Sequence, residues 1–276
     1  MIKKFPVKIY GIVLAVLVVG FLIAGIKIFA NKAAESSNEE VSVNVKEIQN
    51  INYMISKQRF RADPIRTALG GNGSAAGLGE PKFQKAPQGY FEDALFVGDS
   101  RTVGLEEYGN IAGADFFATE GMSVYSIYKE TSEISGIGTV SFKTLMQSRQ
   151  YGKVYIMLGI NELGYRLSDT AARYKDLIDK IQKYQPDALI YIEANLHVSS
   201  ELSKTDKIFK NSRIDNYNNM LAKLADNRNI FYIDANEIFD DADGGLGKEY
   251  TSDNIHIMGK YYGDWGAWIA QNAIVK

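Results

Sequence analysis

The chain has 276 residues, enough for one large domain or for a domain with appendages. Its 31 lysine and arginine residues nearly balance 33 aspartate and glutamate residues, so we expect no nucleic-acid partner, which would need a clustered basic face. The absence of cysteine excludes disulfides, thiolate metal sites and a thiol nucleophile.

The first predicted element is an apolar segment without charges, Ile9–Ile26. As a helix it would extend about 27 Å, close to the hydrocarbon thickness of a bilayer. Lys3, Lys4 and Lys8 precede it, so the positive-inside rule predicts a cytoplasmic N-terminus and an extracellular remainder. We therefore expect residues 1–30 to be a single-pass signal anchor in the cell membrane, with the lipid bilayer as a partner. A cleaved signal peptide is the alternative, although no clear cleavage site follows.

Residues 31–89 are predicted to form an extracellular stalk. Asn31–Glu40 is small and polar, as expected of a spacer, and Val41–Leu69 has apolar residues at helical spacing. The glycine-rich stretch Gly70–Gly79 predicts a flexible linker, with low order expected up to about Gln88.

From residue 90 to residue 276 short apolar runs alternate with amphipathic segments. Continuous apolar runs separated by helices favour a parallel sheet covered on both faces. We predict one α/β domain over 90–276, with helices around Tyr174–Tyr184, Ile214–Leu224 and Trp265–Ile269, the first of them capped by Ser168-Asp169. The five predicted strands are Ala94–Val97, Asp115–Ala118, Val154–Leu158, Ala188–Ala194 and Ile230–Asp234.

Three short polar motifs directly follow the first three predicted strands. They are Gly98-Asp99-Ser100, Glu120-Gly121 and Gly159-Ile160-Asn161. Ligands of such sheets bind beyond the carboxyl ends of the strands, so we expect these motifs to meet at one edge.

A serine hydroxyl needs an adjacent base to become a nucleophile, and the chain has only two histidines. His256 has Asp253 three residues before it, a spacing at which the carboxylate can orient the imidazole. His197 has no such neighbour, so we expect a structural or surface role for it. Ser100, His256 and Asp253 are therefore the candidate nucleophile, base and orienting acid.

Three N–H groups are candidates for binding an oxyanion. Ser100 is expected at the start of a helix, where its own N–H favours negative charge, with Asp99 bracing the turn or capping the helix. Gly121 has no side chain to keep its N–H from a substrate, and Asn161 offers a side-chain amide. Taken singly, Gly121 could be a simple turn glycine and Asn161 a loop cap.

Together these motifs resemble the sequence blocks of the SGNH, or GDSL-type, esterase and acylhydrolase family. Gly98-Asp99-Ser100 is similar to the first block and Gly121 to the second, Gly159-x-Asn161 to the third and Asp253-x-x-His256 to the last. The resemblance covers residues 90–276. It implies a three-layer α/β/α flavodoxin-like sandwich, a Ser-His-Asp triad and an oxyanion hole made by serine, glycine and asparagine.

Two residues depart from the family pattern. Arg101 stands where leucine usually follows the serine, and Glu162 stands where aspartate commonly follows the asparagine. We take Arg101, Glu120 and Glu162 as candidate substrate-binding residues, with a solvent-exposed position as the alternative for Arg101. We expect no cofactor and no metal, because the acidic stretch Asp240–Gly245 lacks the ligand spacing of a calcium loop.

The sequence thus predicts a membrane-anchored extracellular serine esterase, preceded by a transmembrane helix and a flexible stalk. Its expected substrates are small esters or acyl esters, foremost acetyl esters, of a cell-envelope or other polysaccharide. The resemblance also allows an O-acetyltransferase that passes the acyl group to a saccharide hydroxyl beside a membrane acyltransferase partner. A non-catalytic polysaccharide-binding module is a further alternative.

Overall fold

The computed structural model describes residues 82–275, so the predicted anchor at residues 9–26 lies outside the described part. Among the helices within 82–275, none is long and apolar enough to cross a bilayer. Gln84 and Ala273 exchange two backbone hydrogen bonds, at 2.8 and 3.0 Å. The chain from Gln84 onward therefore packs with the domain and is not part of the flexible linker that we expected up to Gln88.

The centre of the domain is a five-stranded parallel sheet with the strand order β2-β1-β5-β6-β7. This is the order of a flavodoxin-like doubly wound sheet, as the sequence predicted. The strands agree with the predicted runs to within one residue at either end: β1 (Ala94–Gly98), β2 (Asp115–Ala118), β5 (Lys153–Met157), β6 (Leu189–Glu193) and β7 (Ile230–Ile233).

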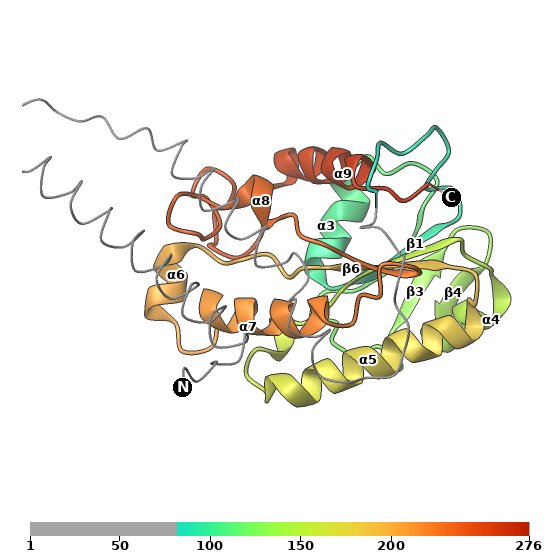
Figure 1. Ribbon diagram of the computed structural model, residues 1–276, viewed down its shortest axis with the longest axis horizontal. Helices are drawn as coiled ribbons and strands as arrows, with labels where there is room; N and C mark the ends of the chain where they lie inside the picture. Colours follow the sequence, from blue (N-terminus) through green and yellow to red (C-terminus); the bar gives the residue numbers. More distant parts are fainter. Residues whose placement is uncertain (1–81, 276) are drawn as a thin grey trace, which may run out of the picture. The chain divides into compact units, whose positions relative to one another are not determined.

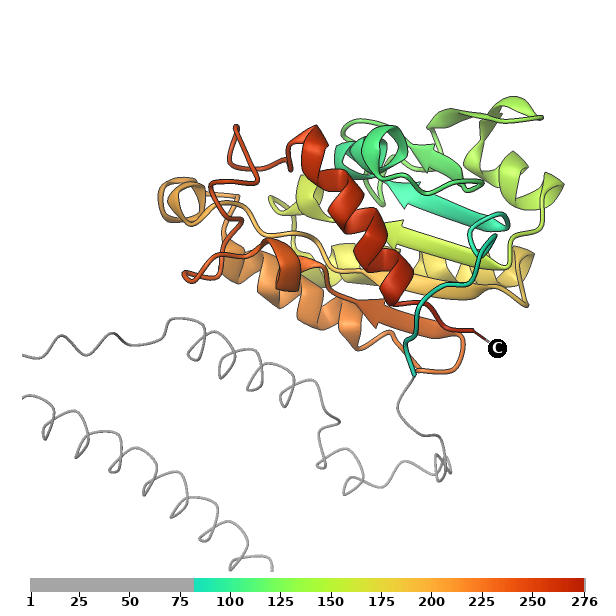
Figure 2. The ribbon, with the colours of Figure 1, turned by 90° about the horizontal axis from the view of Figure 1, so that it is seen from above.

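Helices cover both faces of the sheet, which gives three layers (Figures 1 and 2). One face carries α3 (Ser100–Tyr108), α8 (Asn236–Phe239) and α9 (Tyr262–Gln271). The opposite face carries α4 (Phe142–Ser148), α5 (Leu167–Tyr184) and α7 (Asn211–Ala222). The remaining elements are the short helices α6 (Ser200–Thr205), η1 (Ile160–Glu162) and η2 (Gly259–Tyr261) and a hairpin of β3 (Thr131–Ile134) and β4 (Gly138–Ser141).

A row of aromatic rings crosses the sheet on the face that α3 and α9 cover, with one ring from each strand. Neighbouring ring centroids in this row lie 5.0, 4.4, 4.3 and 5.7 Å apart. Because side chains alternate between the two faces of a strand, a shift of one residue would remove a ring from the row. The row therefore supports the strand register that brings the strand ends to one edge. Its members are Phe116, Phe96, Tyr155, Tyr191 and Phe231.

Two local features of the structure differ from what the sequence led us to expect. The β3–β4 hairpin was not predicted, because its strands are mostly polar and only partly buried and show no apolar periodicity. Helix α5 begins at Leu167, so Ser168 lies inside the helix instead of capping it. Asp169 occupies the first turn, where its carboxylate pairs with Arg166 Nε at 2.9 Å. Its negative charge also stabilises the N-terminus of the helix.

Candidate active site

The turn from β1 into α3 places Ser100 at the first position of the helix. Asp99 caps α3 by accepting a hydrogen bond from the backbone N–H of Arg101 at 3.0 Å, which confirms its predicted capping role. A Cβ atom on Gly98 would lie 1.9 Å from Thr102 Oγ1, so only glycine allows this tight turn. The hydroxyl of Ser100 is thereby presented at the carboxyl edge of the sheet.

Ser100, His256 and Asp253 form a continuous chain of hydrogen bonds. Ser100 Oγ lies 2.9 Å from His256 Nε2, and His256 Nδ1 lies 2.7 Å from Asp253 Oδ2. A carboxylate accepts only, so the ring proton belongs on Nδ1 and Nε2 is left to accept the serine proton. The structure brings together the three side chains that the sequence predicted as nucleophile, base and orienting acid.

The carboxylate of Asp253 is fixed by its own turn. Its Oδ1 atom accepts hydrogen bonds from the backbone N–H groups of Ile255 at 2.9 Å and His256 at 2.8 Å. Partial burial alone would raise the pKa of Asp253, but the hydrogen bonds from His256 and Ile255 outweigh it and lower the pKa to about 2. The group is therefore ionised at neutral pH, as required to stabilise a protonated imidazole.

The other two candidate oxyanion donors are exposed: Gly121 lies in the loop after β2, and Asn161 lies in η1, within the loop after β5. The two loops contact each other. Asn161 Nδ2 donates to the carbonyl of Met122 at 3.1 Å, which fixes the direction of the amide and leaves its second N–H available. Gly121 has φ +73°, a left-handed conformation, and nothing lies within 4 Å of the position that a Cβ atom would take. A substrate oxygen could therefore approach both groups from the exposed side.

Glu162 connects the same two loops from the interior of the protein. The prediction that Glu162 contacts the substrate is therefore wrong. The residue is 1% exposed, and its Oε1 atom accepts a hydrogen bond from the backbone N–H of Val124 at 2.7 Å. Burial raises the pKa of Glu162 to about 7. Glu120 is exposed next to Gly121, so its contact with substrate stays a prediction.

Arg101 also departs from both readings of the sequence, since its side chain is 0% exposed. Nη1 donates to the carbonyl of Leu196 at 2.8 Å and Nη2 donates to the carbonyl of Ile255 at 2.9 Å. The guanidinium therefore connects the segment after β6 with the loop of His256 and is shielded from solvent. The i,i+4 spacing of Arg101 and the core residue Leu105 was a signal that Arg101 faces inward.

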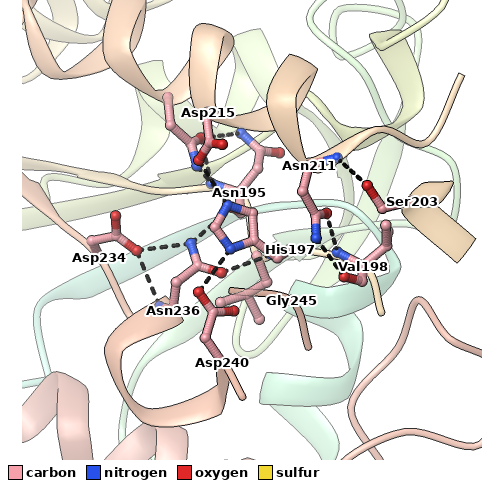
Figure 3. A network of polar contacts seen from close by, with 12 residues as sticks. Asn195, His197, Val198, Ser203, Asn211, Asp215, Asp234, Asn236, Asp240 and Gly245 are labelled. Atoms are coloured by element: carbon pink, nitrogen blue, oxygen red, sulfur yellow. Dashed lines mark hydrogen bonds and ion pairs between the residues drawn. The ribbon is translucent and has the colours of Figure 1, made fainter. Parts of the chain in front are cut away.

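His197 has the structural role that we expected, at the centre of the polar network in Figure 3. Its Nδ1 lies 2.8 Å from Asp240 Oδ2 and its Nε2 lies 3.0 Å from Asp215 Oδ1. Burial alone would lower the pKa of His197, but the hydrogen bonds to the two aspartates outweigh it and raise the pKa to about 10. A protonated His197 thus bridges α7 and the segment after α8. Over residues 82–275, no group of three or more histidine, aspartate and glutamate side chains is arranged to hold a metal ion.

Comparison with known proteins adds two findings. The sequence model of the GDSL-like lipase/acylhydrolase family matches residues 96–262, which include all members of the hydrogen-bonded chain. No curated protein matched the chain.

Two similar solved structures support the fold. One is a GDSL-like lipase from Bacteroides thetaiotaomicron, 15% identical, with 67% of this chain and 89% of that chain covered and a TM-score of 0.50. The other is a Bacteroides fragilis protein assigned as an acylhydrolase, 14% identical, with 69% of this chain and 89% of that chain covered and a TM-score of 0.50.

Proposed function

The chain belongs to the GDSL-like lipase/acylhydrolase family and hydrolyses ester bonds, and on this premise we propose that it is a serine esterase that uses Ser100, His256 and Asp253. The observation that carries the proposal is the hydrogen-bonded chain from Ser100 Oγ through His256 to Asp253, with contacts of 2.9 and 2.7 Å. The distances are those at which a base takes the proton of a nucleophile.

In the first half of the proposed reaction, Ser100 Oγ attacks the ester carbonyl carbon and its proton passes to His256 Nε2. Asp253 stabilises the resulting imidazolium through Nδ1–H. The carbonyl oxygen gains the negative charge and accepts hydrogen bonds from the N–H groups of Ser100 and Gly121 and from Asn161 Nδ2. Collapse of this intermediate breaks the bond to the alcohol, which leaves with the proton from His256, and an acyl-serine results.

In the second half, water replaces the alcohol. His256 Nε2 accepts a proton from water while the water oxygen attacks the acyl carbon, and the same three donors bind the oxyanion. The bond to Ser100 Oγ then breaks, His256 returns the proton to the serine, and the carboxylic acid leaves. Each half of the reaction begins and ends with the same protonation state of His256.

We propose acetyl and other small acyl esters of a cell-envelope or other polysaccharide as substrates, for an enzyme anchored in the membrane with its catalytic domain outside the cell. The uncharged segment Ile9–Ile26 and the preceding lysines support the anchor. Gly121 and Asn161 are exposed, so an ester carried on a bulky polymer can approach them, which supports a polymeric substrate.

The chemistry is tested by p-nitrophenyl acetate turnover of the full chain and of Ser100→Ala, together with covalent labelling by a fluorophosphonate. We expect labelling and rapid turnover with Ser100 present, and loss of both in the variant. Equal rates for the two proteins would reject Ser100 as the nucleophile. Transfer of the acyl group to an added saccharide in excess of hydrolysis would show instead the acetyltransferase reaction, which proceeds through the same acyl-enzyme.

A further inference from the structure

Two tyrosines that the proposed mechanism does not use lie in the same loops as the candidate oxyanion donors. Tyr125 comes four residues after Gly121, and Tyr165 comes four residues after Asn161. Their rings stack, with centroids 5.0 Å apart and an angle of 25° between the ring planes. The pair therefore bridges the two loops that carry the donors, and we call Tyr125 and Tyr165 the tyrosine pair.

The Tyr125 side chain and the Tyr165 backbone are held by contacts with neighbouring residues. Tyr125 donates or accepts a hydrogen bond with Thr170 Oγ1 at 3.2 Å through its hydroxyl, and the guanidinium of Arg173 lies 4.6 Å from its ring centroid. The backbone carbonyl of Tyr165 accepts a hydrogen bond from Arg213 Nη2 at 3.0 Å. The Tyr165 backbone N–H donates to the carbonyl of Glu162 at 2.9 Å.

In spite of these contacts, the residue Tyr165 is 58% exposed. A large aromatic ring that is already stacked on a second ring loses little conformational entropy when a ligand packs on it. The next residue, Arg166, pairs with Asp169 at 2.9 Å, and both of their side chains are more than half exposed. The surface near the candidate oxyanion donors thus combines an apolar ring with charged hydrogen-bonding groups.

We propose that the tyrosine pair is a saccharide subsite, on which a pyranose ring of the alcohol part of the ester packs against Tyr165. This inference rests on the proposed esterase function and specifies its substrate class. A pyranose ring has apolar C–H groups on its faces and hydroxyls on its edge. Its C–H face matches the electron-rich face of Tyr165, and its hydroxyls match the charges of Arg166 and Asp169. A long acyl chain would instead need an enclosed apolar groove.

The test compares hydrolysis of an acetylated oligosaccharide with hydrolysis of ethyl acetate, a small ester without any ring. For Tyr165→Ala we expect kcat/KM on the oligosaccharide to fall about tenfold, as when a stacking ring is truncated, mainly through KM. Ethyl acetate turnover should stay within about twofold of the wild type, because the acyl transfer groups are untouched. Tyr165→Phe keeps the ring and should retain wild-type kinetics on both esters.

Tyr128→Ala is the matched control, since Tyr128 is 44% exposed but packs on Phe142 and Lys180 instead of the tyrosine pair. It should change neither activity. If Tyr165→Ala lowers kcat/KM equally on both esters, Tyr165 has only a structural role. If the variant lowers kcat/KM on ethyl octanoate alone, the ring binds the acyl chain. Either result would overturn the proposal, as would no change at all.

A binding measurement separates failure of this subsite from failure of the esterase. Calorimetric titration of Ser100→Ala with the acetylated oligosaccharide should show binding that weakens about tenfold when Tyr165→Ala is added. If ethyl acetate is hydrolysed but the oligosaccharide affinity is the same in both variants, the subsite is wrong and the esterase stands. If binding depends on Tyr165 but no ester is cleaved, the esterase is wrong and the saccharide subsite stands.

Discussion

Arg101 donates a hydrogen bond from Nη2 to the carbonyl of Ile255 at 2.9 Å. Arg101 directly follows Ser100, and Ile255 directly precedes His256. One buried guanidinium therefore joins the chain segments that hold the candidate nucleophile and the candidate base. We therefore expect the distance between Ser100 Oγ and His256 Nε2 to depend on this connection, although Arg101 forms no hydrogen bond with either side chain of the pair.

Arg101→Leu, which restores the residue type usual in the family, should therefore weaken both stability and activity. It leaves the carbonyls of Leu196 and Ile255 without their charged donor and leaves the buried carboxylate of Asp99 without a neighbouring cation. We expect a loss of about 3–5 kcal/mol in the free energy of unfolding, measured by urea denaturation, and a fall of at least about tenfold in kcat for ethyl acetate. Arg166→Leu is the control, since it removes only an exposed ion pair and should leave the urea denaturation curve nearly unchanged. Equal unfolding curves for the wild type and Arg101→Leu would contradict the connecting role.

Asn161→Ala should lower kcat for ethyl acetate by about 10²–10³-fold with little change in KM, because the amide hydrogen bond forms fully only with the oxyanion. Steady-state kinetics on this ester measure the effect. The reverse result, a raised KM with normal kcat, would show that Asn161 binds the ground state and not the oxyanion. Circular dichroism of the variant checks that the loss of the bond to Met122 has not unfolded the loop's surroundings.

Glu162 should act as a positioning residue whose acceptor oxygen matters more than its charge. Glu162→Gln keeps an oxygen for the N–H of Val124 and should retain most of kcat for ethyl acetate, whereas Glu162→Ala should lose about tenfold as Gly121 and Asn161 drift apart. If the two variants behave alike, the hydrogen bond to Val124 does not position the donors.

The raised pKa of Glu162 predicts that the free energy of unfolding depends on pH. Burial raises the folded-state pKa of Glu162 from 4.5 to about 7, so the folded protein binds more protons than the unfolded chain between these values. The stability contribution of Glu162 is fully present below pH 4.5 and is lost as the pH rises through about 7. Urea denaturation at pH 5 and pH 8 should therefore show a smaller pH dependence for Glu162→Gln than for the wild type. An unchanged difference between the two pH values would contradict this.

His197 should stabilise the fold through its charge. Its folded-state pKa of about 10 lies above the ordinary value of 6.5, so its contribution is fully present below pH 6.5 and is lost as the pH rises through about 10. His197→Asn removes the cation that separates Asp215 from Asp240, and we expect a loss on the order of 3 kcal/mol at pH 6 but much less at pH 10.5. Thermal melts of both proteins across this range measure the difference. A loss of equal size at both pH values would show that His197 acts by packing alone.

Much of the fold and of the candidate site could be predicted because the signals are local. Runs such as Ala94–Val97 are apolar throughout, as expected of strands buried on both faces, and the structure has them within one residue of the prediction. The contact between Asp253 and His256 joins residues three apart, so its spacing was visible in the sequence. The pairing of Ser100 with His256 was predicted because the chain has only two histidines and His256 is the one with an aspartate three residues before it.

The roles of the charged residues could not be predicted in the same way. Whether Arg101 or Glu162 is buried depends on partners contributed by distant segments, such as the carbonyl of Ile255 and the N–H of Val124. The sequence does not show which backbone groups will lie next to a given charged side chain. The stacking of Tyr125 on Tyr165 likewise needs two loops that are forty residues apart in the chain.

The glycines at the carboxyl edge of the sheet differ in how well each position would accept another residue. At Gly159 a Cβ atom would lie 2.1 Å from the ring of Tyr217, so any other residue would require the surrounding side chains to move. At Gly121 no protein atom lies within 4 Å of the position of a Cβ atom, and the left-handed backbone costs an ordinary residue about 1–2 kcal/mol. Asparagine tolerates that conformation, but its side chain would occupy the open space through which a substrate oxygen reaches the N–H of Gly121.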